Sequence, residues 1–165
     1  GMLQHARECA DAKIPFIFDP GQGLPMFSGT ELDELIDLAD YVAVNDYEGK
    51  MLEEKTGHSL EKIATRVQAL IQTMGGEGSV IHAKGKTVSI PVVPADAVLD
   101  PTGCGDAYRA GLLYGITQAW DWESTGRLGA LLGSIKIAHR GAQNHAPSRD
   151  ALAAAFKQAF GYAAL

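Results

Sequence analysis

Cysteine is scarce in this sequence, and its scarcity excludes two kinds of site. The chain of 165 residues has only Cys9 and Cys104, which lie far apart in unlike surroundings. They form neither a CxxC pair nor a disulfide framework. We therefore expect no structural zinc centre and no disulfide-stapled fold.

Long runs of one residue kind are also missing. Lysine and arginine never occur in runs of more than one or two, and the formal charge is −6, from 14 basic and 20 acidic residues. This balance disfavours nucleic acid as the main partner. No apolar stretch approaches the roughly 20 residues of a membrane-spanning helix, and the first residues do not resemble a signal peptide. We expect a cytoplasmic protein that binds neither nucleic acid nor membrane.

Glycine, by contrast, is abundant. The chain has 19 glycines, where an average protein of this length has about 12. They cluster in a few loops, which are therefore the first places to look for function. The length itself predicts a single domain over residues 1–165 with a sizeable core.

The first third of the chain has the pattern of a strand, a helix and a second strand. A helix is predicted over 2–12, a buried strand over 16–18, a helix from Ser28 or Thr30 to about residue 39, and a buried strand over 41–44 that ends at Asn45. Short loops between such elements are typical of a parallel sheet with a right-handed crossover. The fold class is therefore predicted to be α/β.

The rest of the chain is also predicted to contain both helices and strands. We predict a helix from Asp46 to Gly57, another from Ser59 to about residue 73, and strands over 79–83 and 87–93 joined by a tight turn at Lys84 and Gly85. Helices are predicted over about 106–119, 124–140 and 148–160.

The segment DPTGCGDAYRAG, residues 100–111, carries the most chemistry. Gly103 and Gly105 let the backbone turn sharply and approach a ligand. The first amides of the helix that follows have no partners within the helix, so they can face a phosphate. Asp106 in that first turn could accept a proton from an attacking hydroxyl, or it could be an ordinary helix cap. Spacing alone leaves both interpretations open.

The same segment resembles the C-terminal signature of the ribokinase-like (PfkB) kinases of sugars and nucleosides, whose pattern is D-T-x-G-A-G-D. The resemblance implies that Asp106 is the catalytic base and that the amides of Gly103, Cys104 and Gly105 form an anion hole. Pro101 stands in place of the usual threonine and Cys104 in place of the usual alanine. The implied fold is a three-layer one, a mostly parallel sheet flanked by helices.

Two further segments occur in the order found in that family. Asn45 and Glu48 match its N-x-x-E motif, which implies a role around Mg²⁺ and the nucleotide phosphates; they could equally form a helix capping box, and both roles are compatible. Thr73, Gly75 and Gly78 resemble the T-L-G-x-x-G loop that contacts nucleotide phosphates. Without the resemblance, this loop would be an ordinary turn before a strand.

Three positions imply further ligands. Gly141, in a G-A-Q segment, resembles part of the nucleotide and monovalent-cation sites of the family. Asp100 and Thr102 match positions that bind a monovalent cation, K⁺, in some members, although Asp100 could merely cap the loop. The expected cofactors are therefore ATP, Mg²⁺ and K⁺.

The resemblance covers essentially this whole chain but only the C-terminal half of the family pattern. Residues 1–165 are thus expected to be the nucleotide-binding and catalytic part, without the N-terminal substrate and lid part. The implied activity is ATP-dependent phosphorylation of an alcohol group on a sugar or nucleoside. FDPGQGLPMF, residues 18–27, together with DPTGCGD resembles bacterial adenosine kinase-like members more than ribokinase itself. The alternative is a catalytically inactive nucleotide-binding or structural fragment.

The missing half also predicts self-association. A sheet that lacks its N-terminal strands has an unpaired edge, which we expect beside strand 16–18 or strand 41–44. Unpaired apolar edges are templates for association, so a homo-oligomer is expected.

Overall fold

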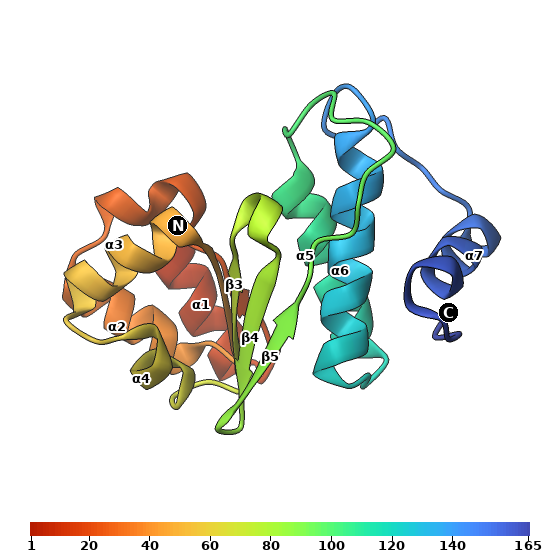
Figure 1. Cartoon of the computed structure of the whole chain (residues 1–165). Coiled ribbons are helices and arrows are strands. Elements are labelled where there is room, and N and C mark those ends of the chain that lie inside the picture. The colour runs from red at the N-terminus through yellow and green to blue at the C-terminus, as the bar shows by residue number, and fades with distance from the viewer. The chain divides into compact units, whose positions relative to one another are not determined.

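The computed structural model describes all residues, 1–165, and its internal contacts divide the chain into two compact units (Figure 1). The first unit contains Gly1–Met74 and Val80–Val88, and the second contains Gly75–Ser79 and Ser89–Leu165.

The first unit begins with the predicted strand, helix and strand. After helix α1 (Met2–Asp11) come strand β1 (Ile17–Phe18), a short 3-10 helix η1 (Gly21–Met26), helix α2 (Gly29–Leu38) and strand β2 (Tyr41–Asn45). β1 and β2 are parallel, with Ile17 opposite Tyr41. Ser28 caps α2 in a capping box with Glu31, which explains why the helix begins there. The predicted crossover unit is confirmed.

The next segment differs from the prediction. Helix α3 (Asp46–Thr56) ends at Gly57 as expected, but helix α4 (Leu60–Ala64) has only five residues and is followed by strand β3 (Ala69–Thr73). The predicted helix up to residue 73 is therefore wrong. Ala69, Leu70 and Ile71 are all buried, because β3 lies between two other strands of the sheet.

β3 completes a mixed five-stranded sheet with the order β1-β2-β3-β4-β5. Strands β4 (Ser79–Ala83) and β5 (Lys86–Ile90) are joined by the predicted turn, in which Lys84 and Gly85 both have positive φ angles, the geometry of a tight hairpin. β2 has a neighbour on each side, so of the two places predicted for an open edge, strand 41–44 is wrong and strand 16–18, which is β1, is an edge strand; β5 is the other edge.

Apolar side chains from the helices and strands form the core of the first unit. Phe18, Val42, Val44 and Leu70 of the parallel strands are buried with residues of α1–α4, namely Ala6, Leu32, Leu35, Ile36, Leu52, Leu60 and Ile63. The predicted α/β class, a sheet flanked by helices, is confirmed.

The second unit is mainly helical. It contains a 3-10 turn η2 (Gly75–Glu77) and helices α5 (Cys104–Thr117), α6 (Trp122–Ile137) and α7 (Arg149–Phe160). Gly111 of α5 packs directly on the backbone of Gly129 in α6, and Phe156 of α7 contacts Trp120 edge-on. None of the helices is long and apolar enough to span a membrane.

Candidate phosphate-binding site

The start of α5 is the centre of the candidate site. Gly103 precedes the helix with φ +81°, and a Cβ atom built on it would lie 3.1 Å from the Cα atom of Ala142. Both the left-handed backbone and this close approach favour glycine. Because the turn at Gly103 leads directly into α5, the first amides of a helix of 14 residues stand at a glycine-lined turn. Such amides can bind an anion.

Asp100 joins this turn to the segment that follows α6. One of its carboxylate oxygens accepts a hydrogen bond from the Thr102 amide at 2.9 Å, and the other accepts one from the Gly141 amide at 2.8 Å. These two backbone hydrogen bonds are the main reason that the pKa of Asp100 is lowered to about 2, with smaller contributions from the Thr102 side chain and the charge of Lys136. The charged carboxylate therefore links two of the predicted segments, the turn that contains Thr102 and the segment that contains Gly141.

A buried lysine stabilises the same turn through hydrogen bonds to its backbone. Lys136, in the last turn of α6, is wholly buried. Its ammonium donates to the main-chain carbonyl of Asp100 at 2.8 Å and to that of His139 at 2.9 Å. The amides of Leu99 and Asp100 donate to the carbonyl of Ile137. The turn is thus tied to the end of α6 by main-chain and charged hydrogen bonds.

The two side chains predicted to be most reactive differ in their surroundings. Asp106 lies in the first turn of α5 and is exposed, so a ligand at the helix start can reach it. Cys104 is half-buried, and burial raises the pKa of its thiol; the nearby charge of Lys136 has a smaller, lowering effect, and that of Asp100 raises the pKa further. Cys104 is thus held as a neutral thiol, the form that packs rather than reacts.

The glycine-rich turn 75–78 is tied to α5 in the same unit. Gly75 and Gly78 have positive φ angles, and a Cβ on Gly78 would lie 2.2 Å from the carbonyl oxygen of Ile90. The next residue, Ser79, shares a buried hydrogen bond of 2.6 Å with the hydroxyl of Tyr108, one turn into α5. The Ser79–Tyr108 pair has no signal in the sequence.

The remaining predicted residues belong to the first unit. Asn45 and Glu48 form a reciprocal capping box at the start of α3, with distances of 2.7 and 2.8 Å. Asn45 is also opposite Thr73 in the parallel register of β2 and β3. The three residues thus meet at the carboxyl ends of two parallel strands, where ligands of α/β folds commonly bind.

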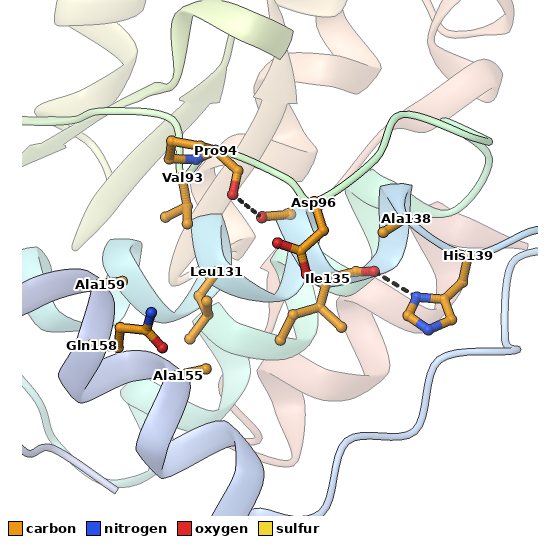
Figure 2. A pocket seen from close by; sticks show the side chains of 11 residues that line it. Val93, Pro94, Asp96, Leu131, Ile135, Ala138, His139, Ala155, Gln158 and Ala159 are labelled. Atoms are coloured by element: carbon orange, nitrogen blue, oxygen red, sulfur yellow. Dashed lines mark hydrogen bonds between the residues drawn. The ribbon is translucent and has the colours of Figure 1, made fainter.

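A pocket of about 380 Å³ lies in the second unit between α6, α7 and the segment 93–96 (Figure 2). Its walls combine apolar side chains, such as Val93, Leu131 and Ile135, with the polar side chains of Asp96, Ser134, His139 and Gln158. Ser134 donates to the carbonyl of Pro94 at 3.1 Å and thereby holds one wall in place. His139, at one end of the pocket, is also the residue whose carbonyl binds Lys136.

The residues predicted to bind Mg²⁺ and K⁺ differ in how well they suit these ions. The chain has no group of three or more His, Cys, Asp or Glu side chains that could hold an ion alone. Mg²⁺ needs only one or two carboxylates when phosphates and water supply the other ligands, so Glu48 suits it. A K⁺ ion at Asp100 fits less well, because Asp100 directs its carboxylate oxygens to two amides and its carbonyl to Lys136.

Comparison with known proteins identifies the family. Residues 1–149 match the sequence family of pfkB family carbohydrate kinases. This chain belongs to that family. The pfkB-family chain is 38% identical over 133 residues to a nucleoside kinase of Methanocaldococcus jannaschii, a match that covers 81% of this chain and 44% of that protein. It is 30% identical over 142 residues to a ribokinase of Bacillus subtilis, covering 86% of this chain and 46% of the other.

Solved structures are similar over the same extent. The nucleoside kinase of Burkholderia thailandensis in complex with inosine superimposes with a TM-score of 0.98 and 55% identity, over 99% of this chain and 55% of that one. The complex of the same protein with ADP-inosine gives a TM-score of 0.97 and 56% identity, over 99% and 51%. The chain therefore spans about half the length of the relatives it matches.

Proposed function

We propose that this chain is the nucleotide-binding and phosphoryl-transfer part of an ATP-dependent kinase that phosphorylates a hydroxyl group of a nucleoside. The observation that carries the proposal is the turn at Gly103, which presents the first amides of α5 beside the exposed carboxylate of Asp106. A nucleoside acceptor is favoured over a sugar because the solved structures with 55–56% identity are those of a nucleoside kinase with inosine and with ADP-inosine.

The proposed chemistry uses each part of the turn. The amides of Gly103 and Gly105 stabilise the negative charge that develops on the transferred γ-phosphoryl group; the amide of Cys104, also predicted for this role, donates to the carbonyl of Pro101 at 3.1 Å in the structure. Asp106 accepts the proton of the acceptor hydroxyl, whose oxygen forms the new bond to phosphorus. The bond between the γ-phosphorus and the bridging oxygen breaks, and its electron pair leaves with ADP. Gly141 and the turn at Gly75 and Gly78 position the nucleotide.

Mg²⁺, when bound, would neutralise phosphate charge. In the first unit, Glu48 would hold the ion through water, while Asn45 and Thr73 fix the ends of the two strands next to Glu48. The pocket between α6 and α7 is the proposed place of the adenine base, because its volume of about 380 Å³, its apolar side chains and its Gln158 amide suit a flat heterocycle.

The first experiment tests nucleotide binding. ATP with Mg²⁺, titrated into ¹⁵N-labelled chain, is expected to shift the amide signals of residues 103–106 and 75–78, with heat in a parallel calorimetric titration. Gly103→Ala should weaken these shifts strongly, since a residue with a side chain is strained at φ +81° and its Cβ would lie only 3.1 Å from Ala142. Gly161→Ala is the matched control: Gly161 has φ +80° but open space around it, so that variant should bind normally. Unchanged spectra of the original chain on ATP addition would refute the proposal.

The second experiment tests the role of Asp106. The chain is assayed with ATP, Mg²⁺ and inosine, adenosine or ribose. Asp106→Asn should lower turnover by roughly 10² to 10⁴, the usual contribution of a positioned base, while leaving ATP affinity unchanged. Asp150→Asn changes another exposed aspartate in the first turn of a helix and should leave turnover as it is. ATP binding without any turnover would instead support the alternative of a non-catalytic nucleotide-binding fragment.

A further inference from the structure

Lys136 is the most unusual charged residue of the second unit. Lysine is almost never fully buried without a partner, yet no part of Lys136 is exposed. Its two hydrogen-bond partners are both uncharged main-chain carbonyls, those of Asp100 and His139. A buried ammonium held by carbonyl oxygens has the surroundings in which proteins bind a dehydrated monovalent cation.

The two carbonyls belong to the two segments that meet at the candidate site. Asp100 begins the turn that leads to α5, and His139 lies just after α6, two residues before Gly141. The carboxylate of Asp100 bridges the same two segments through the amides of Thr102 and Gly141. The ammonium of Lys136 binds a carbonyl of each segment, and the carboxylate of Asp100 binds an amide of each segment. Together they hold the turn in place.

We infer that the ammonium of Lys136 is a built-in monovalent cation of the phosphate-binding turn, so that the turn needs no K⁺ ion. A free cation at the carbonyl of Asp100 would compete with the ammonium for the same oxygen and be repelled by its charge. Lys136 is thus a positioning residue: its hydrogen bonds go to the carbonyls of Asp100 and His139 and not to Asp106, the side chain proposed to react, so it acts through the backbone of Asp100.

This inference concerns the turn to which the proposed function assigns phosphate binding, but it is independent of catalysis. Its test therefore reads the turn in the absence of nucleotide. The readouts are the melting temperature and the hydrogen exchange of the Thr102 and Gly141 amides, in choline chloride, NaCl and KCl at equal ionic strength. For the unchanged chain, KCl and NaCl should give the same values. A specific stabilisation by KCl would overturn the inference.

Two variants make the test sharper. Lys136→Ala removes the ammonium and leaves a space lined by the two carbonyls. Exchange of the Thr102 and Gly141 amides should accelerate about 10- to 100-fold, as expected for the loss of hydrogen bonds to a charged group, and KCl or NH₄Cl should reverse most of the change. Lys136→Met removes the charge but fills the space, so the same acceleration should occur without reversal.

Lys157→Ala, which removes an exposed lysine of α7, is the control and should change nothing at the turn. If folded Lys136→Ala shows the original exchange rates, or if KCl does not restore them, Lys136 is not a substitute cation. The salt series on the unchanged chain decides the matter even if neither Lys136 variant folds.

Discussion

The carboxylate of Asp100 accepts one amide hydrogen bond on each oxygen, and this arrangement makes the turn sensitive to acid. The pKa of Asp100 is about 2 in the folded chain, against 3.8 for an unperturbed aspartate. A lowered pKa contributes stability that is present above the unfolded value and is lost as the pH falls through the folded value. The contribution of Asp100 should therefore disappear between about pH 4 and pH 2.

Asp100→Asn tests this expectation. The variant should be less stable than the original chain at pH 7, because an amide oxygen without charge replaces a carboxylate that satisfies two amides. Urea unfolding from pH 7 down to pH 2 should show the difference shrinking toward zero. Asp11→Asn, an exposed site on α1, serves as the control. A difference that stays constant down to pH 2 would mean that shape, and not charge, makes Asp100 important.

The sequence predicted that the glycines and carboxylates of the turn belong to the candidate site, but it did not predict the role of Lys136. Gly103 and Asp100 stand in a motif whose spacing indicates a turn before a helix. Lys136 stands in a run of mostly small and apolar residues near a helix end, where a basic side chain usually faces solvent and interacts with the helix dipole. Its burial depends on carbonyls at residues 100 and 139, contacts that no local pattern encodes.

The contact between helices α5 and α6 depends on two glycines of α5, Gly111 and Gly115. A Cβ on Gly111 would lie 2.6 Å from the Cα and N atoms of Gly129, and one on Gly115 would lie 2.4 Å from Oγ1 of Thr125. The two helices can therefore approach closely only without side chains at these positions. Since α5 begins at Cys104, this packing also fixes the direction in which its first amides point.

Gly111→Ala should accordingly destabilise the chain, although alanine favours a helix in isolation. Overpacking against a backbone that cannot move costs about 1–3 kcal/mol, measurable by denaturant unfolding. Gly76→Ala is the control, because nothing lies within 4 Å of the added Cβ and the residue has an ordinary φ. Equal stability of Gly111→Ala and the original chain would show that α5 and α6 can separate without cost.

Strand β3 marks the limit of element prediction from this sequence. The apolar run Ala69–Leu70–Ile71 follows a helix without an intervening glycine or proline, and a short apolar run is compatible with either a helix or a buried strand. What makes it a strand is its pairing with β2, in which Ala69 lies opposite Tyr41. That pairing is a contact between distant residues, whereas α2 and α3 have capping boxes that are visible locally.

The sheet as a whole leaves β1 with only one neighbour, and this edge predicts how the chain behaves in solution. β1 has two residues and pairs with β2 alone. Ile14, three residues before it, is 57% exposed, and Met26, at the end of η1, is 82% exposed. An unpaired edge flanked by exposed apolar side chains is a template for another copy of the same chain.

We therefore expect the 165-residue chain to self-associate through the β1 edge. Light scattering coupled to size exclusion at micromolar concentration should give a mass above the 17.5 kDa of one chain. Ile14→Lys should lower that mass, since a lysine at a strand edge opposes pairing. Val98→Lys is the control: Val98 is an apolar residue of the second unit that is also exposed, at 76%, and its replacement should leave the mass unchanged. A monodisperse 17.5 kDa species that unfolds cooperatively would mean that the short β1 edge is too weak a template, and that the remaining elements suffice to cover the core of each unit.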